Sequence, residues 1–176
     1  VEGGYDDYTV ELYKSEHNGA SPPTNAKDAA WIDWRAAKLS DYFGDLNTAV
    51  KAVKSEVIVS SAPSVYPWGK TNYLQDWPTW LSNQYCDYVI PQIYRRDIDS
   101  YKVTLKSQVD ALKSTTDMSK LYAGVLLGVG GNNASDEFVE QMVKENRANG
   151  VGGEVFFYFE GLRYDSTYFT TNYPPK

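Results

Sequence analysis

Four short apolar runs recur at an almost constant spacing along the chain, and this repeat most constrains how it can fold. They begin 31, 33 and 33 positions apart and read VIVSS from Val57, YVIPQIY from Tyr88, LYAGVLL from Leu121 and EVFFYF from Glu154. A strand with one crossover helix occupies about 30 residues, so each interval fits one (β/α) unit. Continuous apolar runs indicate strands that are buried on both faces, as in a parallel sheet.

Four such units make half of an eight-stranded barrel. The chain has 176 residues, whereas a complete (β/α) barrel needs roughly 250. We therefore predict an α/β fold of about four parallel (β/α) units, with residues 1–176 forming a single partial TIM-type barrel domain. Half a barrel leaves open strand edges that can pair with other chains. We expect the upstream half of the same barrel or a second chain to complete the sheet, unless the sheet is open and covered in another way; the lack of an initiating Met at Val1 favours a processed segment.

A long helix is predicted before the first strand. Asn25, with Asp28 three residues later, is its expected N-terminal cap. Apolar residues then step by three or four positions, a stripe that would pack on the outer wall of a sheet. The stripe comprises Ile32, Ala36, Leu39, Phe43, Leu46, Val50 and Val53. Trp31 and Trp34 lie off this stripe, and Trp34 with Arg35 is expected to cover the sheet edge or another loop.

Shorter helices are predicted elsewhere by the same periodicity. One covers residues 8–16, and another covers residues 74–82 with an interruption at Pro78. A third follows the second strand, and a fourth is capped by Ser135 and ends near residue 150. The remaining residues, 161–176, are predicted to form a loop, with or without a partial helical turn.

Composition excludes several classes of function. A net charge of −6 argues against nucleic acid as a partner, because nucleic-acid affinity depends on Lys and Arg that neutralise phosphates. No apolar run is long enough for a membrane span. Cys86 and His17 are the only residues of their kinds, so we expect no internal disulfide, no zinc or other metal site, no histidine-based triad and no cofactor. Cys86 is predicted to be a small buried residue, and His17 to lie in a turn or on the surface.

In α/β barrels the active site lies at the carboxyl ends of the strands. Carboxylates, amides, guanidinium groups and aromatic rings follow the four runs, a set that suits hydroxyl-rich ligands. Glu160 and Asp97 are the candidate catalytic residues. The candidate substrate-binding residues are Tyr66, Trp68, Gln92, Tyr94, Arg95 and Tyr158.

Each charged candidate also has a structural interpretation. Glu160 would be partly desolvated between Phe159 and Gly161, which suits a general acid, but pairing with Arg163 or Arg95 is an alternative. An ion pair is the default role of Asp97. Arg95 and Arg96 would either clamp a carboxylate-bearing sugar or bridge loops.

Two other features follow the strands. Gln92 is expected to be a buried amide that needs a ligand or backbone partner. The glycines from Gly128 to Gly131 lack the Lys and Ser/Thr of a phosphate-binding loop, so residues 128–133 are predicted to be a flexible loop at the mouth of the site.

Several short stretches of the sequence resemble those of a known protein family. GYDDYTVELY, EHNGASPPTN, WIDWRAAK, LQDWPTW, PQIYRRD and FFYFEGL occur in this order over nearly the whole chain. They resemble the family 10 glycosyl-hydrolase-like proteins of bacteria, especially the cyanobacterial branch. The loop SAPSVYPW departs from the SPNP-like spacing of the family, which bears on Tyr66 and Trp68.

The resemblance implies a glycosidase-type barrel of which this chain is the carboxyl-terminal half, presumed strands five to eight with the helix preceding them. Proteins of this family are presumed to cleave glycosidic bonds in cell-wall or extracellular polysaccharide, and are commonly exported. The family's fourth strand ends in adjacent aspartates, which Asp6 and Asp7 resemble. No apolar strand precedes Asp6, so the true pair is expected upstream of Val1.

The leading hypothesis is a carbohydrate-active protein, a glycoside hydrolase whose catalytic site is partly supplied by upstream sequence and whose ligand is a polysaccharide or cell-wall glycan. Glycoside hydrolysis commonly uses two carboxyl groups, and Glu160 or Asp97 would supply the second. The alternatives are a noncatalytic saccharide-binding or assembly module and an inactive stable fragment.

Overall fold

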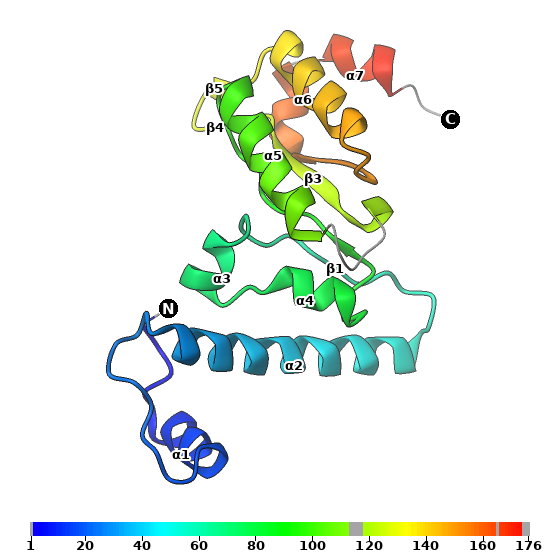
Figure 1. The fold of residues 1–176 in the computed structure, drawn as a ribbon. Coiled ribbons are helices and arrows are strands. Elements are labelled where there is room, and N and C mark those ends of the chain that lie inside the picture. Colours follow the sequence, from blue (N-terminus) through cyan, green and yellow to red (C-terminus); the bar gives the residue numbers. More distant parts are fainter. Residues whose placement is uncertain (1, 113–117, 165, 174–176) are drawn as a thin grey trace. The chain divides into compact units, whose positions relative to one another are not determined.

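The computed structural model describes residues 2–112, 118–164 and 166–173, and the chain divides into two compact units. The first unit is Val1–Val57 with Tyr66–Tyr85, and the second is Ile58–Val65 with Cys86–Lys176. The chain therefore passes from the first unit to the second, back again, and once more to the second. Figure 1 shows the elements coloured along this path.

The first unit is helical. Its elements are α1 (Asp7–Glu16), α2 (Ala29–Val53), α3 (Trp68–Tyr73) and α4 (Trp77–Ser82). The expected helix at residues 8–16 is confirmed, and Asp6 caps it by accepting a hydrogen bond from the Thr9 amide at 3.0 Å. Asp6 thus has a structural role.

Two helix starts differ from prediction. Asp28, not Asn25, caps α2, with its Oδ1 accepting from the Trp31 amide at 3.1 Å. Pro78 lies in the first turn of α4 and does not interrupt a longer helix. Proline is tolerated there because the first amides of a helix have no intrahelical partner.

The buried face of α2 is only partly the predicted stripe. Ile32 and Ala36 are buried, but Val53 is 90% exposed. Trp31, expected off the stripe, is completely buried, because Tyr13 of α1 packs edge-on against it at 5.2 Å. Trp34 contacts Tyr13 of α1, and Arg35 donates to the loop carbonyls of Gly3 and Ala26. Of the two alternatives for Trp34 and Arg35, the structure thus supports contact with a loop and not with a sheet edge.

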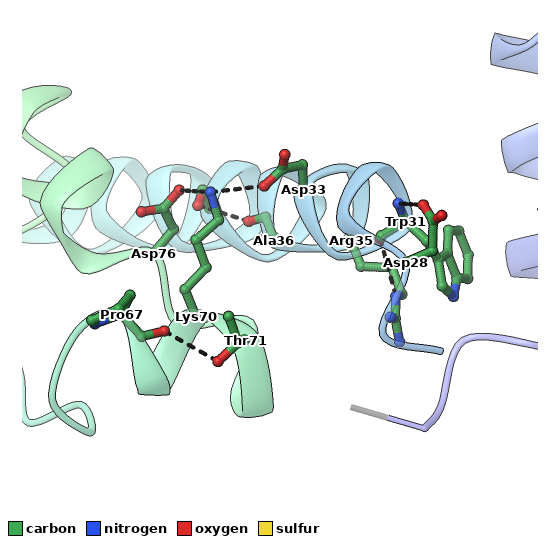
Figure 2. A network of polar contacts seen from close by, with 10 residues as sticks. Asp28, Trp31, Asp33, Arg35, Ala36, Pro67, Lys70, Thr71 and Asp76 are labelled. Carbon is green, nitrogen blue, oxygen red and sulfur yellow. Dashed lines mark hydrogen bonds and ion pairs between the residues drawn. The ribbon is translucent and has the colours of Figure 1, made fainter. Parts of the chain in front are cut away.

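Lys70 of α3 joins three helices of the first unit (Figure 2). Its Nζ lies 2.9 Å from Oδ1 of Asp33 on α2 and 3.1 Å from Oδ2 of Asp76 at the start of α4. Burial alone would lower the pKa of Lys70, but the hydrogen bonds to Asp33 and Asp76 outweigh it and raise the pKa. The protonated lysine therefore stabilises the fold at pH values below the ordinary lysine pKa, and this contribution is lost as the pH rises through the raised pKa.

We expect Lys70→Gln to lower the free energy of unfolding at neutral pH by about 1–2 kcal/mol, the size of a lost charge-assisted contact. Urea unfolding at about pH 7 and about pH 11, on either side of the ordinary lysine pKa, should show the difference from wild type narrowing at the higher pH. Lys54→Gln removes an exposed ion pair of 3.7 Å and should cost about 0.5 kcal/mol or less. Equal losses in the two variants would contradict the bridging role of Lys70.

The second unit contains parallel strands in chain order. β1 (Ser60–Ser61) pairs with β2 (Tyr88–Val89), and β3 (Tyr122–Leu126) pairs with β6 (Gly153–Phe157), both parallel. Parallel bridges from Val89 to Leu121 and from Gln92 to Gly124 join β2 to β3. Parallel α/β architecture is thus confirmed, and the ladders among the described residues do not close into a barrel. Each predicted run overlaps one of these strands, although β1 and β2 have only two residues each.

Helices α5 (Ile98–Leu112) and α6 (Asp136–Ala148) pack against each other in this unit (Figure 1). Ser135 caps α6 as predicted, and its end at Asn149 is followed by Gly150 at φ 71°. Val89, Ile93, Val125 and Leu105 are fully buried in the core. Cys86 is also buried, as predicted, and burial raises the pKa of its thiol to about 12.

The end of the chain is more ordered than the predicted loop. A 3₁₀ helix η2 (Phe159–Tyr164) and α7 (Ser166–Asn172) follow β6, whereas residues 174–176 lie outside the described part. Phe156 of β6 packs edge-on against Phe169 of α7 at 4.9 Å. This contact between residues distant in the sequence holds α7 on the sheet. Local periodicity in the sequence does not predict α7. A short 3₁₀ helix η1 (Met118–Lys120) precedes β3.

One face of the sheet lies away from these helices. Side chains alternate between the faces of a strand, so Val155 and Phe157 lie opposite Phe156. They are 41% and 43% exposed. The sheet therefore buries one face and leaves apolar side chains exposed on the other.

Candidate functional site

The carboxyl ends of β3 and β6 border a cleft of ≈ 390 Å³. A hairpin supplies one wall: β4 (Gly128–Val129) pairs antiparallel with β5 (Asn132–Asn133). Gly130 and Gly131 form its turn at φ 59° and 82°, a conformation that favours glycine. Residues 128–133 therefore form a defined hairpin in place of the predicted flexible loop, and four of its glycine and valine residues line the cleft at the strand ends.

Glu160 and Tyr158 supply the other wall of this cleft, which we call the Glu160 cleft. Glu160 lies in η2 and is half-buried. Its neighbour Phe159 is 70% exposed. Gly161 packs tightly on Leu127, where an added Cβ would lie 2.6 Å from the Leu127 Cβ. This close approach places η2 against the end of β3.

Tyr94 lies beyond β2 and stacks on Phe157, with ring centroids 5.3 Å apart and planes at 27°. Burial raises the pKa of the Tyr94 hydroxyl, so this group remains a protonated hydrogen-bond donor at neutral pH. Tyr158 follows Phe157 and is partly exposed. The ends of β2 and β6 thus present neighbouring aromatic rings.

A second cleft of ≈ 370 Å³ adjoins the first. Asn133 lines both. We call the second one the arginine cleft, because Arg95 and Arg96 line it. Its other lining residues are Leu126, Leu127, Ala134, Ser135 and Phe138.

The side chains of Gln92 and Asp97 each make a hydrogen bond to the protein backbone, which gives both a structural role. Gln92 is exposed, so the expectation of a buried amide is wrong, and its Nε2 donates to the Ala62 carbonyl at 2.8 Å. Asp97 precedes α5 and its Oδ1 accepts from the Ser100 amide at 2.8 Å. This backbone hydrogen bond is the main cause that lowers the pKa of Asp97. A carboxyl group with a lowered pKa is ionised at neutral pH, which disfavours a general-acid role.

Comparison with known proteins adds to this geometry. Residues 1–141 match the family model described as glycosyl hydrolase-like 10. The chain belongs to the glycosyl hydrolase-like 10 family. No curated protein matches it. The structure of the PgaB (BpsB) glycoside hydrolase domain from Bordetella bronchiseptica is similar in fold, with a TM-score of 0.67 at 13% sequence identity.

The match to that structure covers 93% of this glycosyl hydrolase-like chain but 50% of the solved chain. The chain therefore spans half the length of the structure it resembles. The likeness concerns the fold alone at this level of identity.

Two candidate ligand-binding residues of this family member lie in the first unit. Tyr66 packs edge-on against Trp77 at 6.0 Å, and Trp68 packs against Tyr73 at 5.0 Å. Trp68 is largely exposed. The second unit, by contrast, contains Glu160 and Tyr158 in one cleft and Arg95 in the adjoining cleft.

The first unit of the glycosyl hydrolase-like chain has a cavity of ≈ 580 Å³ that the sequence did not predict. Its cations already have structural partners. Arg35 donates to the carbonyls of Gly3 at 2.7 Å and Ala26 at 2.6 Å, and burial lowers its pKa. Figure 2 shows its further hydrogen bond to the Trp31 carbonyl. Lys38 bonds Glu16 at 2.6 Å. We therefore assign the candidate site to the strand ends, where a carboxylate lines the cleft.

Neither a metal centre nor a membrane span is found in the part that the structure describes. No group of three or more His, Cys, Asp or Glu side chains there is arranged to hold a metal ion. No described helix is long and apolar enough to cross a bilayer. The side chain of Arg163, a predicted partner of Glu160, lies outside the described residues.

Proposed function

We propose that this chain is the carboxyl-terminal half of a glycosidase-type barrel, strands five to eight, and that the complete protein hydrolyses glycosidic bonds of a polysaccharide or cell-wall glycan. Membership of the glycosyl hydrolase-like 10 family supports the class of reaction. Parallel strands in chain order and the half coverage of a solved hydrolase domain support the half barrel. The cyanobacterial-type branch and an exported location are parts of the same proposal.

The observation that carries the proposal is the position of Glu160. It follows a parallel strand, is half-buried and lines a cleft beside Tyr158. A carboxyl group in this setting can donate a proton to a leaving-group oxygen or accept one from water. The tyrosine rings offer flat faces and hydroxyl groups to a sugar. The partner carboxylate would come from the upstream half, because two carboxyl groups flank the bond in most glycosidases.

The exposed side chains of the sheet support completion by the upstream half. Val155 and Phe157 lie on the face that a closed barrel buries in its interior. Covering them with further strands would remove apolar area from water. A second chain with the same four strands would serve equally well.

One observation favours a noncatalytic saccharide-binding module. Within the described residues, Glu160 is the one carboxylate that lines either strand-end cleft. A site with a single carboxylate and several aromatic rings can bind a saccharide without cleaving it.

Both readings are tested by one comparison. The protein that includes the upstream half, and this chain alone, are each incubated with a panel of cell-wall and extracellular polysaccharides, and new reducing ends and binding are measured. We expect the complete protein to release reducing ends and this chain alone to release none. Binding without release by the complete protein would overturn the hydrolase and favour the binding module.

A further inference from the structure

We infer that the arginine cleft binds an anionic substituent of the glycan, so that the substrate of this protein is a negatively charged polysaccharide. This inference rests on the proposed function, because it assigns the cleft next to the Glu160 cleft as a sugar subsite. The ligand chemistry is an oxyanion carried by a sugar, either a uronate carboxylate or a sulfate ester.

The charge of the cleft contrasts with that of the whole chain. The net charge of the protein is −6, yet the lining of this cleft contains two arginines and no carboxylate. Asp136 and Glu137 lie in the first turn of α6, but neither of them lines the cleft. A concave site with one sign of charge attracts ligands of the opposite sign.

Arg95 is held in place before any ligand arrives. Its Nε donates to Thr104 Oγ1 at 3.0 Å and its Nη1 donates to the Tyr94 carbonyl at 2.9 Å. Both hydrogen-bond partners are neutral, so these bonds leave the positive charge of Arg95 in place. The Asp97 carboxylate interacts electrostatically with Arg95 but does not line the cleft. A guanidinium group has five N–H donors in a planar fork, and the remaining donors can face the cleft. Fixing the side chain in advance reduces the entropy that binding would cost.

Arg96 completes the pair. It is exposed, and it makes no hydrogen bond or ion pair with another residue that the structure describes. Two neighbouring guanidinium groups suit a carboxylate or sulfate, since both anions accept paired N–H donors.

Asn133 connects the arginine cleft with the Glu160 cleft. Its position in the lining of both clefts places the anionic sugar next to the sugar whose bond Glu160 would act on. The arginine cleft would then select the substrate, whereas Glu160 would transfer the proton.

The test is equilibrium binding by this chain of two matched pairs of oligosaccharides. One pair is oligogalacturonate and its methyl ester; the other is a sulfated galactan oligosaccharide and its desulfated form. We expect one charged member to bind at least about 10-fold tighter than its neutral counterpart, and raised salt to weaken only the charged member. The pair that shows the difference identifies the anion as carboxylate or sulfate.

Two variants locate the effect. Arg96→Gln should remove the preference for the charged member and raise its Kd about 10-fold or more, without unfolding, because Arg96 is exposed. Lys144→Gln makes the same charge change on α6, away from the cleft, and should leave the preference intact.

Equal losses in both variants would reveal general electrostatic attraction and overturn the inference. Equal affinity for both members of each pair would also overturn it, while leaving carbohydrate binding in place. If no probe binds, the inference fails, and the release of reducing ends by the complete protein still decides the proposed hydrolase.

Discussion

Glu160→Gln should lower the turnover of the complete protein by about 10²–10⁴-fold, the usual contribution of a positioned acid or base. Glutamine keeps the size of the side chain but can neither donate a carboxyl proton nor accept one. Glu160 is half-buried at the edge of a cleft, so its replacement leaves the core intact. The measurement is the initial rate of reducing-end release on the polysaccharide that the wild-type protein cleaves.

Glu140→Gln is the matched control, because Glu140 is an exposed partner of Lys144 on α6 and lies outside both clefts. Its turnover should match that of the wild type. Thermal unfolding of all three proteins separates a loss of chemistry from a loss of structure. Wild-type turnover in folded Glu160→Gln would remove this residue from the catalytic machinery.

Trp31→Ala should destabilise the first unit by about 3 kcal/mol. Trp31 is completely buried and stacks on Trp34 with ring centroids 5.1 Å apart. The Arg35 guanidinium lies 4.6 Å from its ring centroid. Replacing a buried Trp by Ala commonly costs about 3–5 kcal/mol. The Trp31 indole N–H is buried without a hydrogen-bond partner in the described structure, and removing this unpaired donor places the loss near the lower end of that range.

Urea unfolding followed by far-ultraviolet circular dichroism measures this loss. Tyr42→Ala, which removes an exposed ring from the same helix, should change the free energy of unfolding by about 0.5 kcal/mol or less. A similarly small change for Trp31→Ala would show that the cluster around Trp31 contributes little to folding.

The repeat of apolar runs predicted the parallel (β/α) units because continuous apolar runs are typical of parallel strands. The expected burial on both faces does not hold for β6, where Val155 and Phe157 are exposed. The cap of α6 was predicted because Ser135 is a suitable capping residue just before its apolar periodicity begins. The cap of α2 was misplaced because Asn25 and Asp28 are both suitable caps, and local sequence alone did not separate them. Helix α7 was missed because its support is the contact of Phe156 with Phe169, which the fold creates.

The strand-end rule brought Glu160 and Tyr158 to one cleft and Arg95 to its neighbour. It did not reveal that Gln92 is exposed, since a run of apolar letters hides which positions face the uncovered side of a sheet. The hairpin at Gly130 and Gly131 was also missed. Adjacent glycines flanked by Val129 and Asn132 were the available signal for a tight turn.

The path of the chain between β1 and β2 couples the two units through connectivity. These strands pair in the second unit, while the residues that join them, 66–85, belong to the first. If α3 and α4 unfold, the ends of a longer flexible loop must be held together by the β1–β2 ladder, at an entropic cost that grows with loop length. Destabilising the first unit should therefore loosen the first pair of strands even where no side chain connects them. No single cut of the chain separates the two units: a cut between residues 57 and 58 leaves residues 66–85 of the first unit attached to the second.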